Sequence, residues 1–245
     1  MKVTDAVWET RNLGVRTFEI MIEQGDTIDN FVHIHSELLK KEAQYIVIKM
    51  PSNKNDFLYM LPKYGYTFVE TIFYTSLKVK NYQVPKALEQ MDRNFTLTEV
   101  IDNTHLERVL SEVEKGIFDT DRISMDPNFS KEQSARRYVN WIRDMTKARD
   151  CIFEVNLSNQ PFGFFTLKQI DQDRVYPVLL GCYEEYKDKG LGALLVKKCN
   201  DYIWSLGYKE ITTCLSSNNI NIFKCNLLFG TQISSIYYTF VKYVG

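Results

Sequence analysis

A short glycine-rich segment, Lys187-Asp188-Lys189-Gly190-Leu191-Gly192-Ala193, is the part of the sequence best suited to chemistry. It follows an apolar run that ends at Tyr183 and precedes a run that predicts a helix over 192–206. A helix N-terminus presents unpaired backbone N–H groups and a partial positive charge. Glycines let a pyrophosphate approach those groups closely. The loop therefore predicts a diphosphate site, although a tight strand-to-helix turn would need the same two glycines.

Two other phosphate-binding motifs do not fit this loop. A P-loop requires Lys followed by Ser or Thr after its second glycine, and a Rossmann fingerprint requires a complete GxGxxG. Neither pattern is present. Cys182 precedes the loop and invites the idea of a covalent acyl-cysteine, but a small buried hydrophobe is the commoner role of such a residue.

The composition limits the class of protein. The 245 residues are 44% apolar and 25% charged, a globular balance with a net charge of −1, which argues against bulk binding of nucleic acid. No apolar run is long enough for a membrane span, and the start carries no secretory pattern. Five scattered cysteines fit free thiols in a reducing cytoplasm better than disulfides or zinc. His33 and His35 do not make a metal site with the distant His105, so no metal is expected.

The C-terminal half alternates between helical and strand-like segments, which predicts a mixed α/β sheet with helices on its faces. Ser130 followed by Gln133 forms a capping box at the start of one of these helices. The expected helices span 104–115, 131–147, 192–206 and 219–229. The expected strands span 151–155, 162–169, 176–183, 210–215 and 233–241.

The N-terminal half contains a weak copy of part of the C-terminal half. A shift of 165 positions aligns residues 46–77 with 211–242, with identities that include Ser52–Asn53 and Gly65. In both copies a strand, a Ser-Asn turn, a helix, a glycine and a second strand follow in order. The glycine suits a left-handed C-cap. We therefore predict a supporting domain over 1–84 and a working domain over 85–245, separated by a polar stretch that ends at Pro85.

The pattern Lys-x-x-Gly-x-Gly-Ala between an apolar strand and an amphipathic helix resembles motif A of the GNAT acyltransferases. Lys187 stands where that motif has Arg or Gln, which keeps the charge but loses the planar fork. Leu206-Gly207-Tyr208, Ser217-Asn218-Asn219 and Phe229-Gly230 continue the resemblance. It implies a GNAT fold preceded by a partial, degenerate GNAT-like domain, with acyl-CoA as co-substrate and no metal. The residues then expected to bind the coenzyme are Cys182, Tyr183, Lys187, Lys189, Gly190, Leu191, Gly192, Ala193 and Asn219.

The resemblance also implies a mechanism in which a neutral amine attacks the thioester directly. A backbone N–H of the strand segment 180–183 would steady the oxyanion, and Gly181 is a candidate for the bulge that opens this strand. The family pattern places its proton-donating tyrosine where this chain has Asn226, and an amide is not an acid. Asn226 as a hydrogen-bond donor, and Tyr237 or Tyr238 as replacements, remain open. The candidates for a general base are Asp119, Asp121, Asp126, Glu184 and Glu185. Of these, Asp121 is the one expected to be catalytic.

A narrower resemblance covers nearly the whole chain. The opening Val7–Val15 is similar to the "W-E-x-x-x-x-G-V" stretch of the dTDP-fucosamine acetyltransferase family, and residues 118–122 and 137–142 match its acceptor side. This resemblance implies a dTDP-linked amino sugar as acceptor, acylated for a surface polysaccharide. The residues expected to contact the acceptor are Phe118, Asp119, Arg122 and Gly181, with Arg122 meeting the diphosphate as a fork.

Two alternatives stay open beside this interpretation. One is a GNAT enzyme that acts on another amine, such as a peptide N-terminus or an antibiotic. The other is a non-catalytic acyl-CoA-binding protein, which is consistent with Asn226 at the position of the family's tyrosine. No nucleic-acid or membrane partner is expected, and the sequence leaves a homodimer open.

Overall fold

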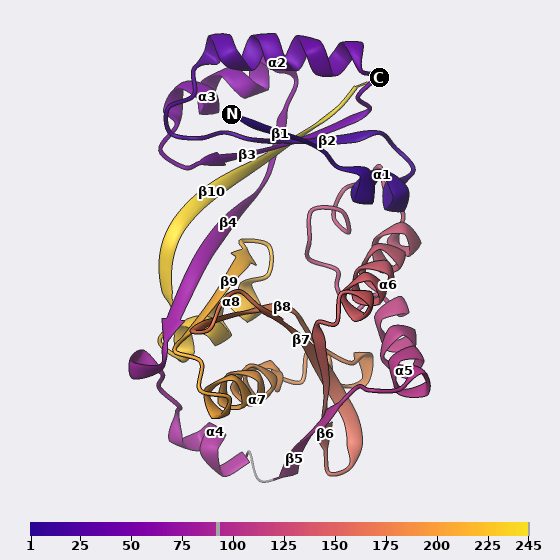
Figure 1. The fold of residues 1–245 in the computed structure, drawn as a ribbon, viewed down its shortest axis with the longest axis vertical. Coiled ribbons are helices and arrows are strands. Elements are labelled where there is room, and N and C mark those ends of the chain that lie inside the picture. The colour runs from indigo at the N-terminus through magenta and orange to yellow at the C-terminus, as the bar shows by residue number, and fades with distance from the viewer. Residues whose placement is uncertain (92–93, 245) are drawn as a thin grey trace. The chain divides into compact units, whose positions relative to one another are not determined.

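The computed structural model describes residues 1–91 and 94–244 (Figure 1). The chain forms two compact units, and both are discontinuous in sequence. The first comprises Met1–Phe73, Ser216–Asn218 and Ser235–Gly245, and the second comprises Tyr74–Leu215 and Asn219–Ser234.

The first unit is a sheet with helices α2 and α3 on one side of it (Figure 1). Its strand order is β1-β2-β3-β10-β4, with β2 and β3 parallel and β10 antiparallel to β3. Its core joins apolar side chains of α2 and α3 to those of β2 and β3. The elements are β1 (Lys2–Asp5), α1 (Val7–Leu13), β2 (Thr17–Met21), α2 (Ile28–Lys40), β3 (Tyr45–Pro51), α3 (Asn55–Met60) and parts of β4 (Thr67–Lys78) and β10 (Gln232–Tyr243).

The second unit is a sheet of order β4-β9-β8-β7-β6-β5, in which neighbours from β5 to β8 are antiparallel and β8 and β9 are parallel. The mixed α/β sheet expected from the sequence is therefore confirmed. Its elements are α4 (Lys86–Met91), β5 (Phe95–Glu99), α5 (Asn103–Glu114), α6 (Lys131–Lys147), β6 (Cys151–Leu157), β7 (Gln160–Gln169), β8 (Arg174–Cys182), α7 (Gly192–Ser205), β9 (Glu210–Ser216) and α8 (Ile220–Leu228).

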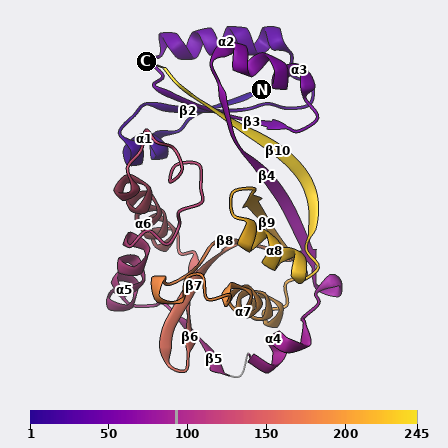
Figure 2. The ribbon, with the colours of Figure 1, turned by 180° about the vertical axis from the view of Figure 1, so that it is seen from behind.

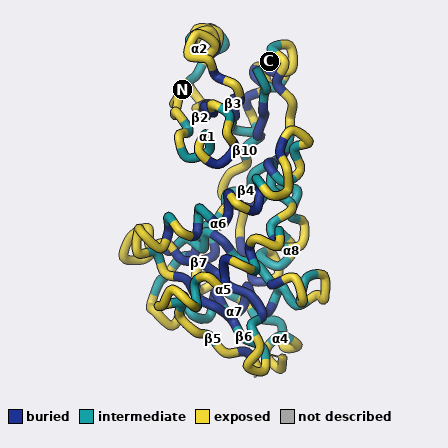
Figure 3. Tube along the Cα trace, turned by 90° about the vertical axis from the view of Figure 1, so that its right-hand side faces the viewer, coloured by how far each residue is buried: buried dark blue, intermediate teal, exposed yellow. Residues whose placement is uncertain are grey.

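Alternation along the strands divides the core of the second unit into two layers. Phe153 and Phe165 pack with α7, whereas Ile152 and Phe164 pack with α5 and α6. Successive side chains of a strand point to opposite faces, so helices cover both faces of this sheet, α7 on one side and α5 and α6 on the other (Figure 2). The buried residues of the unit accordingly gather in its strands and on the inner faces of α5, α6 and α7 (Figure 3).

Most of the predicted elements are found within a few residues of their expected bounds. Helix α6 begins and ends as predicted, and the Ser130 side chain accepts the Gln133 N–H in a complete capping box. Several strands extend one or two residues beyond their expected bounds: β6 continues to Leu157, β7 begins at Gln160, β8 begins at Arg174, and β10 continues to Tyr243. No helix within residues 1–91 and 94–244 is long and apolar enough to cross a membrane.

The internal repeat is more regular in structure than in sequence. A shift of 165 positions turns the bounds of β3 into those of β9 and the bounds of β4 into those of β10. The same shift places α2 over α7 to within one residue at its start. Gly65 and Gly230 both follow the intervening helical segment with positive φ, 78° and 89°. The first half therefore repeats part of the second half, as the sequence predicted.

The last strand of each copy pairs with the sheet of the other copy. In the first unit β10 pairs with β3, with Val241 opposite Val47. In the second unit β4 contacts β9: the Thr75 hydroxyl donates to the Thr213 carbonyl at 3.2 Å, and Ser76 donates to Glu210. Neither copy supplies all of its own sheet. The predicted boundary between residues 84 and 85 stays a prediction, because compact units and sequence domains need not coincide when strands are exchanged.

Candidate active site

A cavity of about 670 Å³ lies in the second unit. Four segments that are distant in sequence line it: the loop after α5, the end of β8, the glycine-rich loop and the first turns of α8. Its lining residues are Ile117, Phe118, Asp119, Thr120, Leu180, Gly181, Cys182, Tyr186, Lys187, Asp188, Gly190, Leu191, Gly192, Ala193, Asn219, Asn221, Ile222, Lys224 and Cys225.

The cavity opens where β8 separates from β9. Strand β8 pairs with β7 as far as Cys182, but with β9 only at Arg174 and Val175. The β7–β8 register shifts around Thr166, whose buried hydroxyl accepts the Leu179 N–H at 3.0 Å. Such a shift bends a strand locally, and the Thr166 hydroxyl satisfies a backbone donor that regular pairing would leave unmatched.

The expectation that Gly181 marks the bulge is wrong. Gly181 pairs regularly with Phe164, and the register shift lies earlier in β8, between Pro177 and Leu180. The reason for glycine is steric instead. A Cβ at Gly181 would lie 3.1 Å from Ile117 Cδ1 and from the Phe118 ring. Gly181 therefore lets these two side chains cover the end of β8.

The glycine-rich loop leaves open space at the start of α7 and gives this helix no side-chain cap. Gly190 has φ of 73°, a left-handed conformation that favours glycine, and a Cβ at Gly190 or Gly192 would meet nothing within 4 Å. The N-cap residue Leu191 makes no side-chain hydrogen bond to the helix. The Leu194 N–H donates to the Leu191 carbonyl at 2.9 Å. The first N–H groups of a helix generally lack intrahelical acceptors, so the open space at this helix start fits an anionic group such as a pyrophosphate.

Lysine and aspartate side chains pair at the edge of this loop. Lys187 Nζ lies 2.7 Å from Asp119 Oδ2, although the two residues are 68 positions apart. The hydrogen bond that Lys187 donates to Asp119 raises the pKa of Lys187, so the ammonium stays charged. Lys189 does not line the cavity; its Nζ lies 5.1 Å from the centre of the Tyr186 ring, a cation–π contact.

Asp121 is held by several donors. Its carboxylate accepts from the backbone N–H of Ile123, from the Ser124 hydroxyl at 2.7 Å and from the Tyr138 hydroxyl at 2.7 Å. Burial would raise its pKa, but Arg137 and these hydrogen bonds outweigh burial and lower it. A carboxylate so placed is a weak base, and its contacts fix the loop that carries Phe118 and Asp119.

Helix α8 presents a thiol to the cavity instead of the residue at the usual tyrosine position. The Asn219 side chain caps α8 by accepting the Ile222 N–H at 3.1 Å. The Asn226 amide donates to the Ile222 carbonyl of its own helix at 2.9 Å, and Asn226 is not a lining residue. Cys225 and Cys182 line the cavity. Burial raises the pKa of both thiols, that of Cys182 to about 12 with a contribution from Cys225, so both are protonated at neutral pH.

A buried polar network below the loop was not anticipated. The carboxylate of Glu154 in β6 is fully buried and accepts hydrogen bonds from the Tyr183 hydroxyl at 2.6 Å and from Arg108, with His105 Nε2 at 2.9 Å. The side chain of Tyr183 thus points into this network rather than lining the cavity. A single glutamate inside the apolar run Cys151–Val155 was the available signal, because a buried charge must be paired.

The remaining predicted residues fall in two places. Arg122 is half-buried in the loop after Phe118 and is not a lining residue. Tyr237 and Tyr238 belong to the first unit, opposite Pro51 and Met50 of β3.

Comparisons with known proteins concern the segment that holds the cavity and the fold as a whole. The model of the Acetyltransferase (GNAT) family matches residues 117–225, which include all the lining residues named above. No curated protein sequence matches the chain.

Solved structures share the fold at low identity. A GCN5-related N-acetyltransferase from Sphaerobacter thermophilus is 10% identical with a TM-score of 0.63, over 99% of this chain and 75% of that one. A tandem GNAT protein from the clavulanic acid biosynthesis pathway is 11% identical with a TM-score of 0.60, over 95% and 76%. A glucosamine N-acetyltransferase region of a fungal GH3 β-N-acetylglucosaminidase is 10% identical with a TM-score of 0.65, over 92% of this chain but 30% of that one.

The segment that matches the GNAT family model contains both the strand β8, which separates from β9, and the start of α7. Residues 117–225 thus carry the pattern of a GNAT acetyltransferase, and the solved structures share the fold over most of the chain.

Proposed function

We propose that this enzyme transfers an acyl group from acyl-CoA to the amine of a dTDP-linked amino-deoxy sugar, as a step toward a surface polysaccharide such as O-antigen or capsule. The observation that carries the proposal is one cavity that combines the glycine-rich loop with the segment Ile117–Thr120. Support for the sugar comes from the resemblance of Val7–Val15 and residues 118–122 to sugar-nucleotide acyltransferases. The fungal neighbour named for glucosamine is consistent with an amino-sugar acceptor.

The end of β8 is suited to receive the thioester carbonyl. The Tyr183 N–H donates to Phe162 of β7 at 2.9 Å. Because N–H groups alternate in direction along a strand, those of Cys182 and Leu180 point to the side where β9 has separated. Both residues line the cavity. In this proposal one of these N–H groups donates to the oxyanion as it develops.

The amine needs little help to lose its proton. An amine with a pKa of about 8 is partly neutral at pH 7, so attack does not require a strong base. Against the effect of burial, Arg137 and several hydrogen bonds lower the pKa of Asp121, which makes it a poor general base. Asp119, by contrast, lines the cavity. The proton then passes to water.

The departing thiolate also needs little stabilisation by the protein. A thiol with a pKa of about 8.5 is a good leaving group, and the Asn226 amide is turned to its own helix. The protonated thiol of Cys225 is a donor on the cavity wall. Tyr237 and Tyr238 stay alternative donors. The five free cysteines fit a reducing compartment, which supports a cytoplasmic enzyme.

Release of free coenzyme A thiol, measured with dTDP-amino sugars and a panel of simple amines and peptides, tests the acceptor class. Arg122→Ala should raise KM for the nucleotide sugar more than KM for acyl-CoA. In this proposal Arg122 binds the diphosphate of the sugar nucleotide and not the coenzyme. Arg143→Ala is the matched control, because Arg143 is an exposed arginine of α6 that pairs with Glu107. Faster turnover of any simple amine or peptide than of every dTDP-amino sugar would reject the sugar and leave the acyltransferase.

A further inference from the structure

The ion pair between Lys187 and Asp119 joins two parts of the cavity that serve different ligands. Lys187 belongs to the loop that fits the coenzyme pyrophosphate, and Asp119 belongs to the segment on the acceptor side. Their side chains are 30% and 55% exposed. Exposed pairs of this kind are weak and exchange partners readily, so a ligand that enters the cavity can compete for either member.

A bound pyrophosphate would be a strong competitor for Lys187. Lys187 lies three residues before Gly190 in the chain, and it lines the same cavity as Gly190 and Gly192. A diphosphate brings more charge and more acceptor oxygens than one carboxylate, and Lys is a flexible point charge that can turn to it. Asp119 would then repel the diphosphate at short range unless the two anions separate.

We propose that Lys187 is shared between two anions. It pairs with Asp119 in the free enzyme and turns to the coenzyme A pyrophosphate in the bound enzyme, which releases the Asp119 carboxylate to receive the ammonium form of the acceptor amine. The inference rests on the proposed function for its amine and on the coenzyme site for its first half. Asp119 is thereby a positioning residue for a cationic primary amine.

The handover couples the two binding sites. Coenzyme binding frees Asp119, so it strengthens binding of a cationic amine, and the amine must strengthen coenzyme binding by the same factor. Binding in the order coenzyme and then amine is favoured, because an amine that arrives first must displace Lys187 from Asp119. Loss of the Asp119 charge should thus have opposite effects on the two ligands.

Calorimetric titration with coenzyme A alone tests the first half without any acceptor. Asp119→Asn should tighten coenzyme A binding about two- to fivefold, because Lys187 no longer has a competing partner. Asp188→Asn is the matched control for simple loss of negative charge, since Asp188 is an exposed aspartate of the same cavity with φ of 60°, which asparagine tolerates. Its gain should be smaller.

A Lys187→Met background shows whether the effect passes through Lys187. In that background Asp119→Asn should increase coenzyme A affinity by no more than Asp188→Asn does. Equal gains from the two aspartate variants in the parent enzyme, or weaker coenzyme binding by folded Asp119→Asn, would overturn the handover. Asp119→Ala serves as a second variant if Asp119→Asn does not fold.

Steady-state kinetics with whichever acceptor proves active tests the second half. Asp119→Asn should raise KM for the amine with little change in kcat, and Asp119→Glu should restore part of it. An unchanged KM for the amine would overturn the role of Asp119. A preference for a non-sugar amine would reject the sugar proposal alone, since the coenzyme titration does not depend on it.

Discussion

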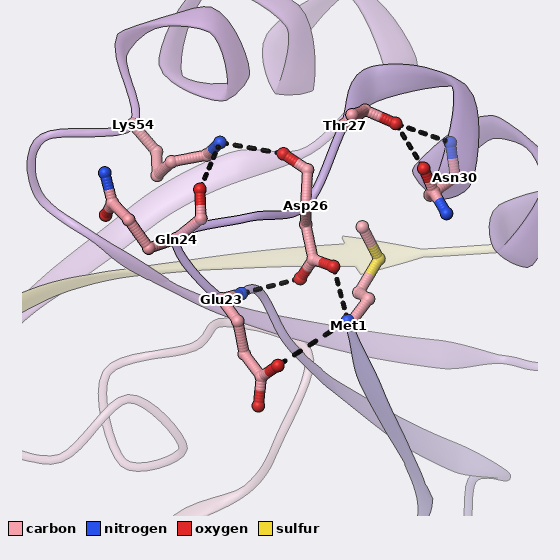
Figure 4. A network of polar contacts seen from close by, with 7 residues as sticks. All are labelled: Met1, Glu23, Gln24, Asp26, Thr27, Asn30 and Lys54. Atoms are coloured by element: carbon pink, nitrogen blue, oxygen red, sulfur yellow. Dashed lines mark hydrogen bonds and ion pairs between the residues drawn. The ribbon is translucent and has the colours of Figure 1, made fainter.

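The two copies of the repeat treat the same strand-to-helix junction in opposite ways. In the first copy the junction between β2 and α2 is closed by the chain's own polar groups (Figure 4). The Thr27 side chain accepts the Asn30 N–H and caps α2. The Asp26 carboxylate accepts the Glu23 N–H at 2.7 Å and pairs with the Met1 amine at 2.5 Å.

Lysine takes a different part in each junction. In the first copy Lys54 Nζ donates to the backbone carbonyl of Asp26 at 2.8 Å and to that of Gln24 at 3.3 Å, so its charge serves the loop itself (Figure 4). In the second copy Lys187 lies on the cavity wall, and Leu191 offers α7 no side-chain cap.

The two copies share their strands, but at this junction only the second has a helix start without a side-chain cap. A capped helix has fewer free N–H groups, and a carboxylate such as Asp26 repels an anion. The second copy also carries α5, α6 and the loop between them where the first has only the seven-residue helix α1. This segment supplies Phe118 and Asp119, so the first copy has no counterpart of this wall of the cavity.

The largest effect should come from closing the open junction. Gly190→Val places a branched side chain where the pyrophosphate must approach, and it strains a residue with φ of 73°. Coenzyme A affinity should fall at least tenfold, about 1.4 kcal/mol. Gly25→Val makes the same change in the loop of the first copy, where a Cβ also meets nothing within 4 Å, and should leave the affinity unchanged.

Calorimetry on variants with parental circular dichroism measures both affinities. Full coenzyme binding by folded Gly190→Val would remove the loop from the site. A loss with Gly25→Val as large as with Gly190→Val would contradict the difference between the two copies.

A smaller effect is expected at Asn226, where the family pattern has its proton donor. A neutral hydrogen bond contributes about 0.5–1.5 kcal/mol, which corresponds to roughly three- to tenfold in kcat. The Asn226 amide already donates to Ile222 of its own helix. Asn226→Ala should consequently cost tenfold or less in kcat, far from the roughly 10²–10⁴-fold that loss of a true acid costs.

Tyrosines of β10 provide the alternative to an enzyme without a general acid. Tyr237→Phe and Tyr238→Phe should each leave kcat within a few-fold of the parent. A hundredfold fall of kcat with either variant, at unchanged acyl-CoA affinity, would show that a tyrosine from the last strand donates the proton. The same pair of variants thus tests whether the second copy depends on a strand that pairs with β3.

The sequence predicted those features that depend on neighbours along the chain. The capping box at Ser130, the glycines of the loop and the register of the repeat are local patterns, and each is found as expected. The exchange of β4 and β10 was out of reach, because alternation shows which face of a strand is buried but not which strand lies beside it.

Long-range polar contacts were beyond prediction for a similar reason. The pairing of Lys187 with Asp119 joins residues 68 positions apart, and no spacing rule connects them. Asp121 is a candidate base by residue type alone, and only its contacts with Ser124 and Tyr138 show how firmly it is held. Glu154 carried a signal as a charge in an apolar strand, but its partners could not be read from the sequence.

The smallest expected effect is a dependence of stability on pH. It should differ between the two units, because their buried titratable groups differ. In the first unit His35 is 6% exposed, and its Nδ1 lies 3.0 Å from the Tyr66 hydroxyl. Burial, and then the positive charge of Lys242, lower the pKa of His35 below its ordinary value. In the second unit the pKa of Asp121 is lowered as well, but its ordinary value is 3.8.

The sign of the pH effect follows from where each group takes up its proton. Above about pH 6.5 His35 is neutral in both the folded and unfolded states and has no effect. Below that pH the unfolded chain binds a proton that the folded first unit disfavours, so stability falls as the pH drops toward the folded pKa of His35. Asp121 contributes stability that is lost only as the pH falls below 3.8. Between about pH 7.5 and 5, protection factors, which correct exchange rates for their intrinsic dependence on pH, should therefore fall around Phe31 and Tyr66 before they change around Tyr138. His35→Gln removes the titration and should abolish this difference, and equal protection of the first unit at both pH values in the parent enzyme would contradict it.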